Sequence, residues 1–379
     1  MDTYDLSVVV VENNMNEEAV MRNWKSGKDV PQYTTANEIS NIAGLPILGT
    51  PQGLILCFAS PNFDSNKYVS YAKALILHLD VLLPQSDYIN FICLAFNELP
   101  PAHQTVFEQF VALLAQCGNL STSSLASLTS QIDNETIQNS VSEALNTPAF
   151  SLPIFQTTDT PLDMLTPEEF AQMLAYRDHK LLSLISAHEL VCARWTLEHY
   201  QYDCNGVNLW TTAQITLSQY VARTINEDPG RYAYFLEVLN HLLTLNCFSG
   251  IMCIFLKLNS KEFANLAANH NLDAFSELCS VEGNCRNIKA ATRKLLIKKK
   301  KRLGGISYAK PSVPIVPHVS LIFSQIALTE DGNILKIKKN LFKYEKMLMI
   351  YSLIEQLELY KACDFPSIPL SIEFIQALL

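Results

Sequence analysis

The pattern of hydrophobic and polar positions divides the chain into a mixed N-terminal stretch and a much longer helical remainder. Two short apolar runs rich in β-branched residues, 6–11 and 54–59, predict strands, and prolines and glycines break the chain between them. From residue 66 onward, apolar residues recur mostly at three- and four-residue steps, which is typical of amphipathic helices. We expect helices over residues 66–83, 86–99 and 103–116, and one or two more within 119–148.

Helical periodicity dominates after Pro161. Thr166 can cap a helix, Pro167 suits its first position, and Glu168 and Glu169 favour the positive end of its dipole. The Pro- and Thr-rich stretch around residues 148–161 predicts a boundary between a mostly helical N-terminal domain, 1–155, and an all-α domain, 156–379. Helices are expected near 167–174, 178–184, 186–197, 211–226, 229–246, 248–257, 260–270, 286–302, 317–329 and 336–361.

Charge is divided unevenly between these two parts. The 379 residues are 49% hydrophobic and 17% charged, with a net charge of -9. Residues 1–154 hold 15 acids and 5 bases, a net of -10, whereas residues 155–379 hold 22 acids and 23 bases, a net of +1. Residues 74–176 contain no Lys or Arg. An acidic surface repels phosphate backbones, so we expect no nucleic-acid partner.

The composition favours a cytoplasmic protein. No segment approaches 18 uninterrupted apolar residues, and the N-terminus lacks the basic region of a secretory signal peptide. Ten cysteines are scattered without a CxxC pair, which predicts reduced, mostly buried thiols and no zinc site.

Motifs for covalent chemistry are missing from the sequence. It contains no GxxxxGK[ST] phosphate loop, no GxGxxG after a strand, no HExxH and no GxSxG. The eight histidines occur singly, and paired acids such as Glu168 and Glu169 are explained by the helix dipole. We therefore expect an interaction protein without a cofactor or metal rather than a hydrolase or transferase.

A basic region lies between residues 286 and 310, which hold ten Lys or Arg and no acid. Its densest part is Lys298, Arg302 and the three lysines between them. One interpretation is a solvated helix end, because cations stabilise a helix C-terminus. The other is attraction to an acidic partner or an anionic membrane surface, at about 1 kcal/mol for each basic residue near the membrane.

A helical hairpin is predicted over residues 315–360. Asp331, Gly332 and Asn333 form a strong turn signal, and apolar helical patterns lie on both sides. The second helix is apolar almost all round, so we expect its far half to be buried. An exposed tip on a buried stem suits a rigid wedge, and two packed helices with a solvent loop are the alternative.

This hairpin and three earlier blocks resemble the catalytic domain of Ras guanine-nucleotide exchange factors of the Son-of-sevenless type. The blocks occur in the family's order over residues 160 to about 375. They are TPLDMLTPEEFAQ at 160–172, HELVCARW at 188–195, LNCFSG at 245–250 followed by LNS at 258–260, and the hairpin with VPH at 316–318, TEDGN at 329–333 and NLFK at 340–343.

The resemblance implies a guanine-nucleotide exchange factor that binds a Ras, Rap or Ral class GTPase, wedges its hairpin against the switch regions and expels GDP. By position, the family's tip carboxylate is Asp331 and its apolar residue is Ala327. Leu328 could substitute for Ala327 after a small register change, and Asn333 matches the tip Asn. The resemblance further implies GTPase contacts from Trp195, Asn246, Phe248, Gln325 and Lys343.

Several positions depart from the family pattern. Asp331 replaces the usual Glu and reaches one methylene less, and Ala327 is smaller than the usual apolar residue. Eukaryotic relatives place a helical Ras exchanger motif domain upstream, where it braces the hairpin. Residues 61–150 lie in that place without a residue match, so an unrelated helical or α/β module is an equal alternative. The sparse charge and the N-terminus suit a bacterial effector acting in host cytosol.

Two other functions compete with exchange. The first is a non-catalytic scaffold that binds a GTPase through the groove without a working wedge. The second is a membrane-surface adaptor that uses the basic run at Lys298.

Overall fold

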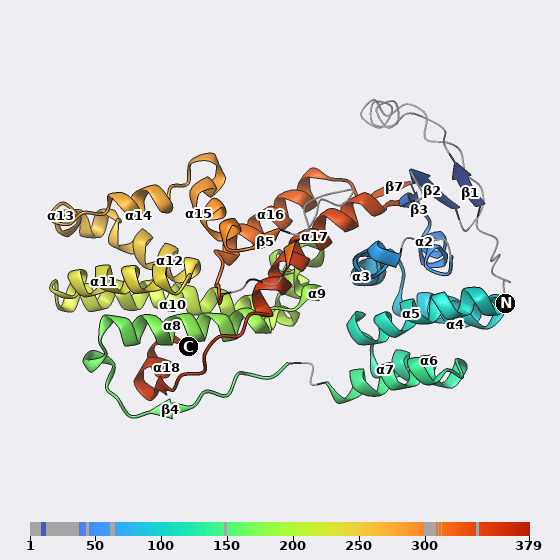
Figure 1. The fold of residues 1–379 in the computed structure, drawn as a ribbon, viewed down its shortest axis with the longest axis horizontal. Helices are drawn as coiled ribbons and strands as arrows, with labels where there is room; N and C mark the ends of the chain where they lie inside the picture. The colour runs from blue at the N-terminus through green and yellow to red at the C-terminus, as the bar shows by residue number, and fades with distance from the viewer. Residues whose placement is uncertain are drawn as a thin grey trace. The chain divides into compact units, whose positions relative to one another are not determined.

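A computed structural model of the chain describes residues 9–12, 38–42, 45–60, 65–147, 150–298, 308–309, 311, 313–338 and 341–379. Its contacts define two compact units (Figure 1). Unit 1 comprises Met1–Ala149 and Leu328–Ser352, and unit 2 comprises Phe150–Ala327 and Leu353–Leu379. The two helices of the hairpin each run from one unit into the other, so the tip of the hairpin belongs to unit 1.

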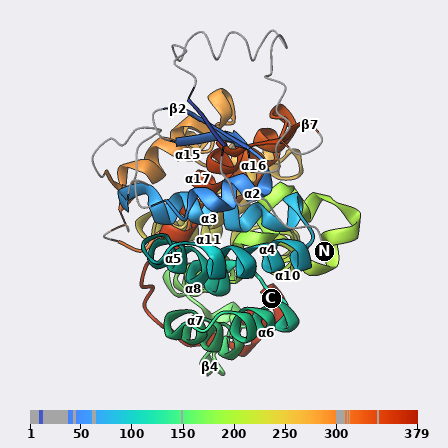
Figure 2. The same cartoon turned by 90° about the vertical axis from the view of Figure 1, so that its right-hand side faces the viewer.

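Unit 1 is built mainly from helices. α5 packs on α3 and α7, and α4 packs on α6, so that α6 and α7 lie beneath α4 and α5 in Figure 2. The amphipathic pattern within 119–148 is confirmed as two helices. The helices are α2 (Pro51–Cys57), α3 (Ser65–Leu82), α4 (Gln85–Glu98), α5 (Pro101–Cys117), α6 (Thr122–Gln131) and α7 (Glu135–Asn146).

The strand predicted at 54–59 is wrong, because these residues lie mostly in helix α2. Thr50 caps α2 by accepting a hydrogen bond from the Gly53 amide at 3.1 Å, and Pro51 occupies the first helical position. Five of the seven helical residues are buried. A short apolar run buried on all sides has the same pattern in a strand and in a helix, so periodicity could not separate them.

A five-stranded sheet joins the N-terminal strands to the hairpin. Its order is β1-β2-β3-β8-β7, with β1 parallel to β2 and the other pairs antiparallel. The helix predicted over 336–361 is therefore wrong in its first part, and helical structure begins only at Tyr344. The strands are β1 (Val9–Glu12), β2 (Glu38–Ile42), β3 (Leu45–Gly49), β7 (Lys336–Lys338) and β8 (Leu341–Lys343).

Residues of the hairpin complete the core of unit 1. Phe342, Tyr344 and Met347 are buried in the same apolar cluster as α2, α3 and α5. The Tyr344 hydroxyl donates to the Tyr71 carbonyl, and the two rings lie 5.9 Å apart. Burial raises the pKa of Tyr344 well above its usual value, so this hydroxyl stays protonated and remains a donor.

Replacing Phe342 is expected to destabilise unit 1. Phe342→Ala removes a buried ring from the core, which costs about 3–5 kcal/mol in comparable sites. Urea titration followed by hydrogen exchange should show the peptides of α3 and α5 losing protection at lower urea than in the wild type. Ile334→Ala is the matched control, since Ile334 is 70% exposed. Equal midpoints for both variants would contradict the role of Phe342.

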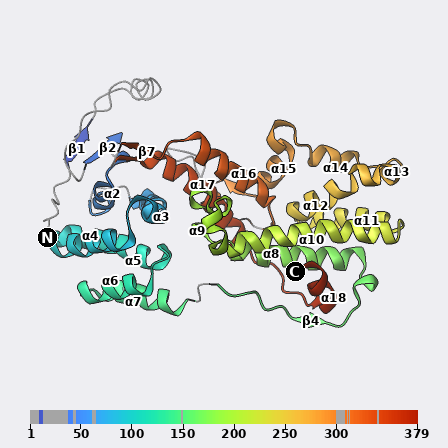
Figure 3. The ribbon, with the colours of Figure 1, turned by 180° about the vertical axis from the view of Figure 1, so that it is seen from behind.

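Unit 2 is all helical apart from short strand pairs. Figure 3 shows its long helices α8, α10 and α11 running together, with α18 against α10. The longer helices are α8 (Pro167–Leu184), α10 (Asn205–Glu227), α11 (Arg231–Thr244), α12 (Phe248–Leu258), α15 (Glu282–Lys294), α16 (Val319–Gly332), α17 (Tyr344–Lys361) and α18 (Ile372–Leu378). The short elements are α9 (Ala187–Leu190), α13 (Ala264–Ala267), α14 (Asp273–Leu278), and the two-residue pairs β4 (Thr157–Thr158) with β9 (Leu370–Ser371) and β5 (Ile297–Lys298) with β6 (Tyr308–Ala309).

Helix α8 begins as the sequence predicts. The Thr166 hydroxyl accepts from the Glu169 amide at 3.2 Å, and the Glu169 carboxylate accepts from the Thr166 amide at 2.9 Å. These bonds lower the pKa of Glu169. The break predicted near 174–178 is wrong, because α8 continues through a fully buried ion pair between Arg177 and Asp178, 2.6 Å apart.

Two further boundaries differ from the prediction. The helix predicted over 186–197 is only α9, followed by the 3₁₀ segments Val191–Thr196 and Glu198–Asp203. The helix predicted over 286–302 is α15, which ends at Lys294, and residues 299–302 of the basic run lie outside the described residues. The prediction of a mainly α chain is confirmed. Within the residues placed by the structure, no helix has the length and apolarity needed to cross a membrane.

Candidate functional site

A tight turn between α11 and α12 supports the start of the hairpin. Asn246 adopts a left-handed conformation with φ of 56°, which Asn tolerates better than most residues. Its carbonyl accepts from the Val316 amide at 3.1 Å, and its side-chain amide donates to the Pro314 carbonyl at 3.3 Å. The Phe248 amide donates to the Val316 carbonyl at 2.8 Å. Asn246 thus fixes the segment that leads into α16.

Phe248 and Ser249 continue this support. Phe248 is 2% exposed, so its ring belongs to the interior of unit 2. The buried Ser249 hydroxyl donates to the Pro317 carbonyl at 2.6 Å and accepts from the Val319 amide at 3.3 Å. Ser249 therefore satisfies one of the free amides at the N-terminus of α16.

Trp195, which comes much earlier in the sequence, also packs against α16. Its half-buried ring is 5.2 Å from the ring of Phe323 on α16, with an angle of 37° between them. The preceding 3₁₀ segment contains positive φ values at Cys192 and Ala193, 56° and 48°. Two such residues in succession are uncommon and cost backbone strain.

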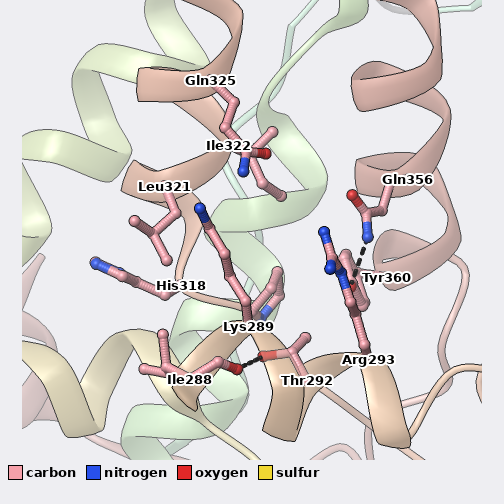
Figure 4. Close-up of a pocket in the computed structure, with 11 residues that line it drawn as sticks. Ile288, Lys289, Thr292, Arg293, His318, Leu321, Ile322, Gln325, Gln356 and Tyr360 are labelled. Carbon is pink, nitrogen blue, oxygen red and sulfur yellow. Dashed lines mark hydrogen bonds between the residues drawn. The ribbon is translucent and has the colours of Figure 1, made fainter. Parts of the chain in front are cut away.

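Gln325 lies two residues after Phe323 on α16 and lines a pocket between α15, α16 and α17 (Figure 4). His318 at the start of α16 lines it too, and burial lowers the pKa of His318 to about 4. The imidazole is therefore neutral at physiological pH and contributes no charge to the pocket.

The hairpin tip exposes both an apolar and an acidic side chain. Leu328 is 64% exposed and Asp331 is also exposed, whereas Ala327 is partly buried. The Asn333 side-chain amide donates to the Thr329 carbonyl at 3.0 Å, so this Asn closes the end of α16. Asn333 thus orders the tip that presents Leu328 and Asp331.

Asp331 occupies an electrostatically unfavourable place. It lies in the last turn of α16, where the helix dipole and free carbonyls concentrate negative charge. Within the described residues, no hydrogen bond or ion pair holds its carboxylate. Local conflicts of this kind concentrate at functional sites.

Lys346 on α17 binds the end of α16 at the hairpin tip. Its ammonium lies 2.5 Å from the Glu330 carboxylate, and the two side chains are only 6% and 12% exposed. The same ammonium donates to the Glu330 carbonyl at 3.1 Å and the Asn333 carbonyl at 2.8 Å. Lys346 therefore neutralises one tip acid and caps the C-terminus of α16, which leaves Asp331 as the acid that faces solvent.

Lys343 ends strand β8, next to Phe342. Its amide donates to the Leu335 carbonyl at 2.8 Å, and its side chain is partly buried in unit 1. It thus lies at the base of the β7–β8 pair rather than at the tip.

The family comparison covers this whole set of residues. The model of the RasGEF domain matches residues 169–348, from within α8 to within α17. This chain carries a RasGEF domain. Ras guanine nucleotide exchange factor R of Dictyostelium discoideum is 23% identical over 234 residues, which cover 56% of this chain and only 12% of that protein.

The RasGEF domain gathers its predicted residues in two groups. In unit 2, α16 and its support bring together Trp195, Asn246, Phe248, Gln325 and Ala327. In unit 1, the tip holds Leu328, Asp331 and Asn333, with Lys343 on the neighbouring strand. Their part in GTPase binding stays a prediction. Within the described residues, no group of His, Cys, Asp and Glu is arranged to hold a metal.

Sequence reasoning missed three cations of this region. Lys346 lies on α17 and binds the carboxylate and the carbonyl of Glu330 on α16. The one signal in the sequence was the pair of acids, Glu330 and Asp331, at a helix C-terminus, where a nearby cation is favourable. Lys289 and Arg293 lay in the noted basic region, but the pocket they enter became visible only with the fold.

Proposed function

We propose that the RasGEF domain is a guanine-nucleotide exchange factor for a Ras-type GTPase of the Ras, Rap or Ral class. The observation that carries this is the RasGEF match combined with an exposed tip, where Leu328 and Asp331 project from an end of α16 that Lys346 holds in place. The mechanism involves no covalent step and needs no cofactor.

Exchange is a problem of coupled binding. A nucleotide held at about picomolar affinity corresponds to roughly 16 kcal/mol, so its spontaneous release is very slow. A protein that binds the nucleotide-free GTPase more tightly than the loaded form weakens nucleotide binding by the same factor. The hairpin would supply this preference by occupying space that the loaded GTPase needs.

Asp331 and the apolar tip have separate tasks in this mechanism. The Asp331 carboxylate would repel phosphate and bind the cation that held the phosphate in the GTPase. Leu328, rather than the smaller Ala327, supplies exposed apolar volume where magnesium would be displaced. Trp195 and Gln325 would bind the switch regions beside α16.

Residues 1–149 would brace the hairpin. Phe342, Tyr344 and Met347 complete the core that α2, α3 and α5 form in unit 1, and β8 pairs with β3. This supports a role like that of a Ras exchanger motif domain, since the hairpin would lose these partners without the N-terminal residues.

A nucleotide-dependent complex tests the proposal. The full chain, mixed with Ras, Rap and Ral proteins stripped of nucleotide, should co-elute with one of them in gel filtration. Adding millimolar GDP should dissolve that complex, because coupling acts in both directions. A complex that GDP leaves intact would instead support the non-catalytic scaffold.

The remaining hypotheses stay untested predictions. The basic run 298–302 was predicted to bind an anionic membrane. Its first residue, Lys298, ends β5, and residues 299–302 lie outside the described residues. A cytoplasmic location, with action at a membrane surface, suits a Ras-type partner. An origin as a bacterial effector remains a hypothesis from composition.

A further inference from the structure

The pocket between α15, α16 and α17 has an apolar floor. It has a volume of about 400 Å³, including space open to solvent. Ile288, Ile322 and Tyr360 line it and are each buried. Because much of this volume is open to solvent, the pocket can take the end of one partner side chain at its mouth.

Two cations from α15 enter this pocket. Lys289 and Arg293 are four residues apart, so they lie on one face of the helix, and Figure 4 shows both side chains rising between α16 and α17. Arg286, three residues before Lys289, continues the same face. No carboxylate lines the pocket.

These cations have no compensating charge in the part of the chain that the structure describes. No acidic side chain there forms an ion pair with Arg286, Lys289 or Arg293. Like charges four residues apart repel each other on a helix, and only Arg293, in the last turn of α15, gains from the helix dipole. A carboxylate from outside would relieve the repulsion, and the Arg293 fork can hold it through two hydrogen bonds.

We propose that this pocket receives a carboxylate-bearing segment of the bound GTPase and selects for GTPases that are acidic there. The inference rests on the proposed exchange function, because Gln325 lines both the pocket and the predicted GTPase site. The apolar floor favours a protein side chain over a lipid headgroup, since a side chain brings apolar carbon atoms to the floor as well as a carboxylate to Lys289 and Arg293.

Charge reversal of the pocket tests the proposal. Lys289→Glu combined with Arg293→Glu in the full chain should lower kcat/KM for GDP release at least tenfold, mainly through KM. The wild-type rate should fall as salt rises, and the double variant should lose that dependence. Lys294→Glu is the control, because it reverses one charge on α15 outside the pocket and should leave the rate unchanged.

The outcomes separate this proposal from the exchange function. Replacing the contacted acid of the GTPase with Lys should restore activity to the double variant. An active wild type whose rate the double substitution leaves unchanged would overturn the pocket proposal alone. Loss of binding to phosphatidylserine vesicles in the double variant, with GDP release unchanged, would also overturn the pocket proposal, because the pocket would then bind a lipid. A wild type inactive on every GTPase would overturn both.

Discussion

Asp331→Ala should abolish most of the exchange activity while making the protein slightly more stable. A charge-assisted hydrogen bond contributes about 1.5–3 kcal/mol, so its loss should slow stimulated GDP release roughly 10- to 150-fold. Removing an acid from the C-terminus of α16 should raise the free energy of unfolding by about 0.3–1 kcal/mol. Stopped-flow release of fluorescent GDP and urea titration measure the two effects.

This pair of opposite changes distinguishes function from structure. Glu237→Ala removes another exposed acid, on α11, and should change neither quantity. If Asp331 served only as a turn former, its replacement would lower stability and leave GDP release intact. That result would remove the carboxylate from the mechanism.

Lys346→Met should have the second largest effect, because it removes the ammonium that pairs with the Glu330 carboxylate at 2.5 Å. Breaking a fully buried ion pair costs about 3–5 kcal/mol, and the slight exposure of Glu330 lowers our expectation to about 2–3 kcal/mol. The end of α16 also loses two hydrogen bonds. Hydrogen exchange should accelerate across residues 328–335, and GDP release should slow with it.

Two comparisons isolate the cause. Adding Glu330→Gln to Lys346→Met should recover part of the stability, because the carboxylate that loses the Lys346 ammonium is then replaced by a neutral amide, but the lost cap should keep exchange slow. Lys257→Met breaks a more exposed pair with Glu262, 3.4 Å apart, and should cost far less stability, because solvent screens exposed ion pairs. Unchanged hydrogen exchange at 328–335 in Lys346→Met would contradict the assigned role of Lys346.

Local signals in the sequence predicted much of the fold. The box formed by Thr166 and Glu169 needs residues only three apart, and it starts α8 where predicted. The N-terminal helices followed from apolar spacing within each segment. Such features depend on neighbours in the chain, which the sequence displays directly.

Elements whose structure depends on contacts with residues distant in the sequence could not be predicted from local patterns. β8 is a strand because it pairs with β3, nearly 300 residues earlier, and its apolar residues alone also fit a helix. The predicted turn at Asp331 and Gly332 is instead the end of α16, which Lys346 stabilises from α17. In the candidate site, the family blocks predicted Asp331 and Trp195. The sequence could not show that Lys289 and Arg293 line a pocket together with Ile322, because Ile322 lies on another helix.

The rate of GDP release tests the central claim most directly. The full chain at micromolar concentration would be mixed with Ras, Rap and Ral proteins loaded with fluorescent GDP, in the presence of excess unlabelled GTP. An exchange factor should accelerate release from at least one of them by tenfold or more, and Asp331→Ala should not. Release at the spontaneous rate from every GTPase would contradict the account.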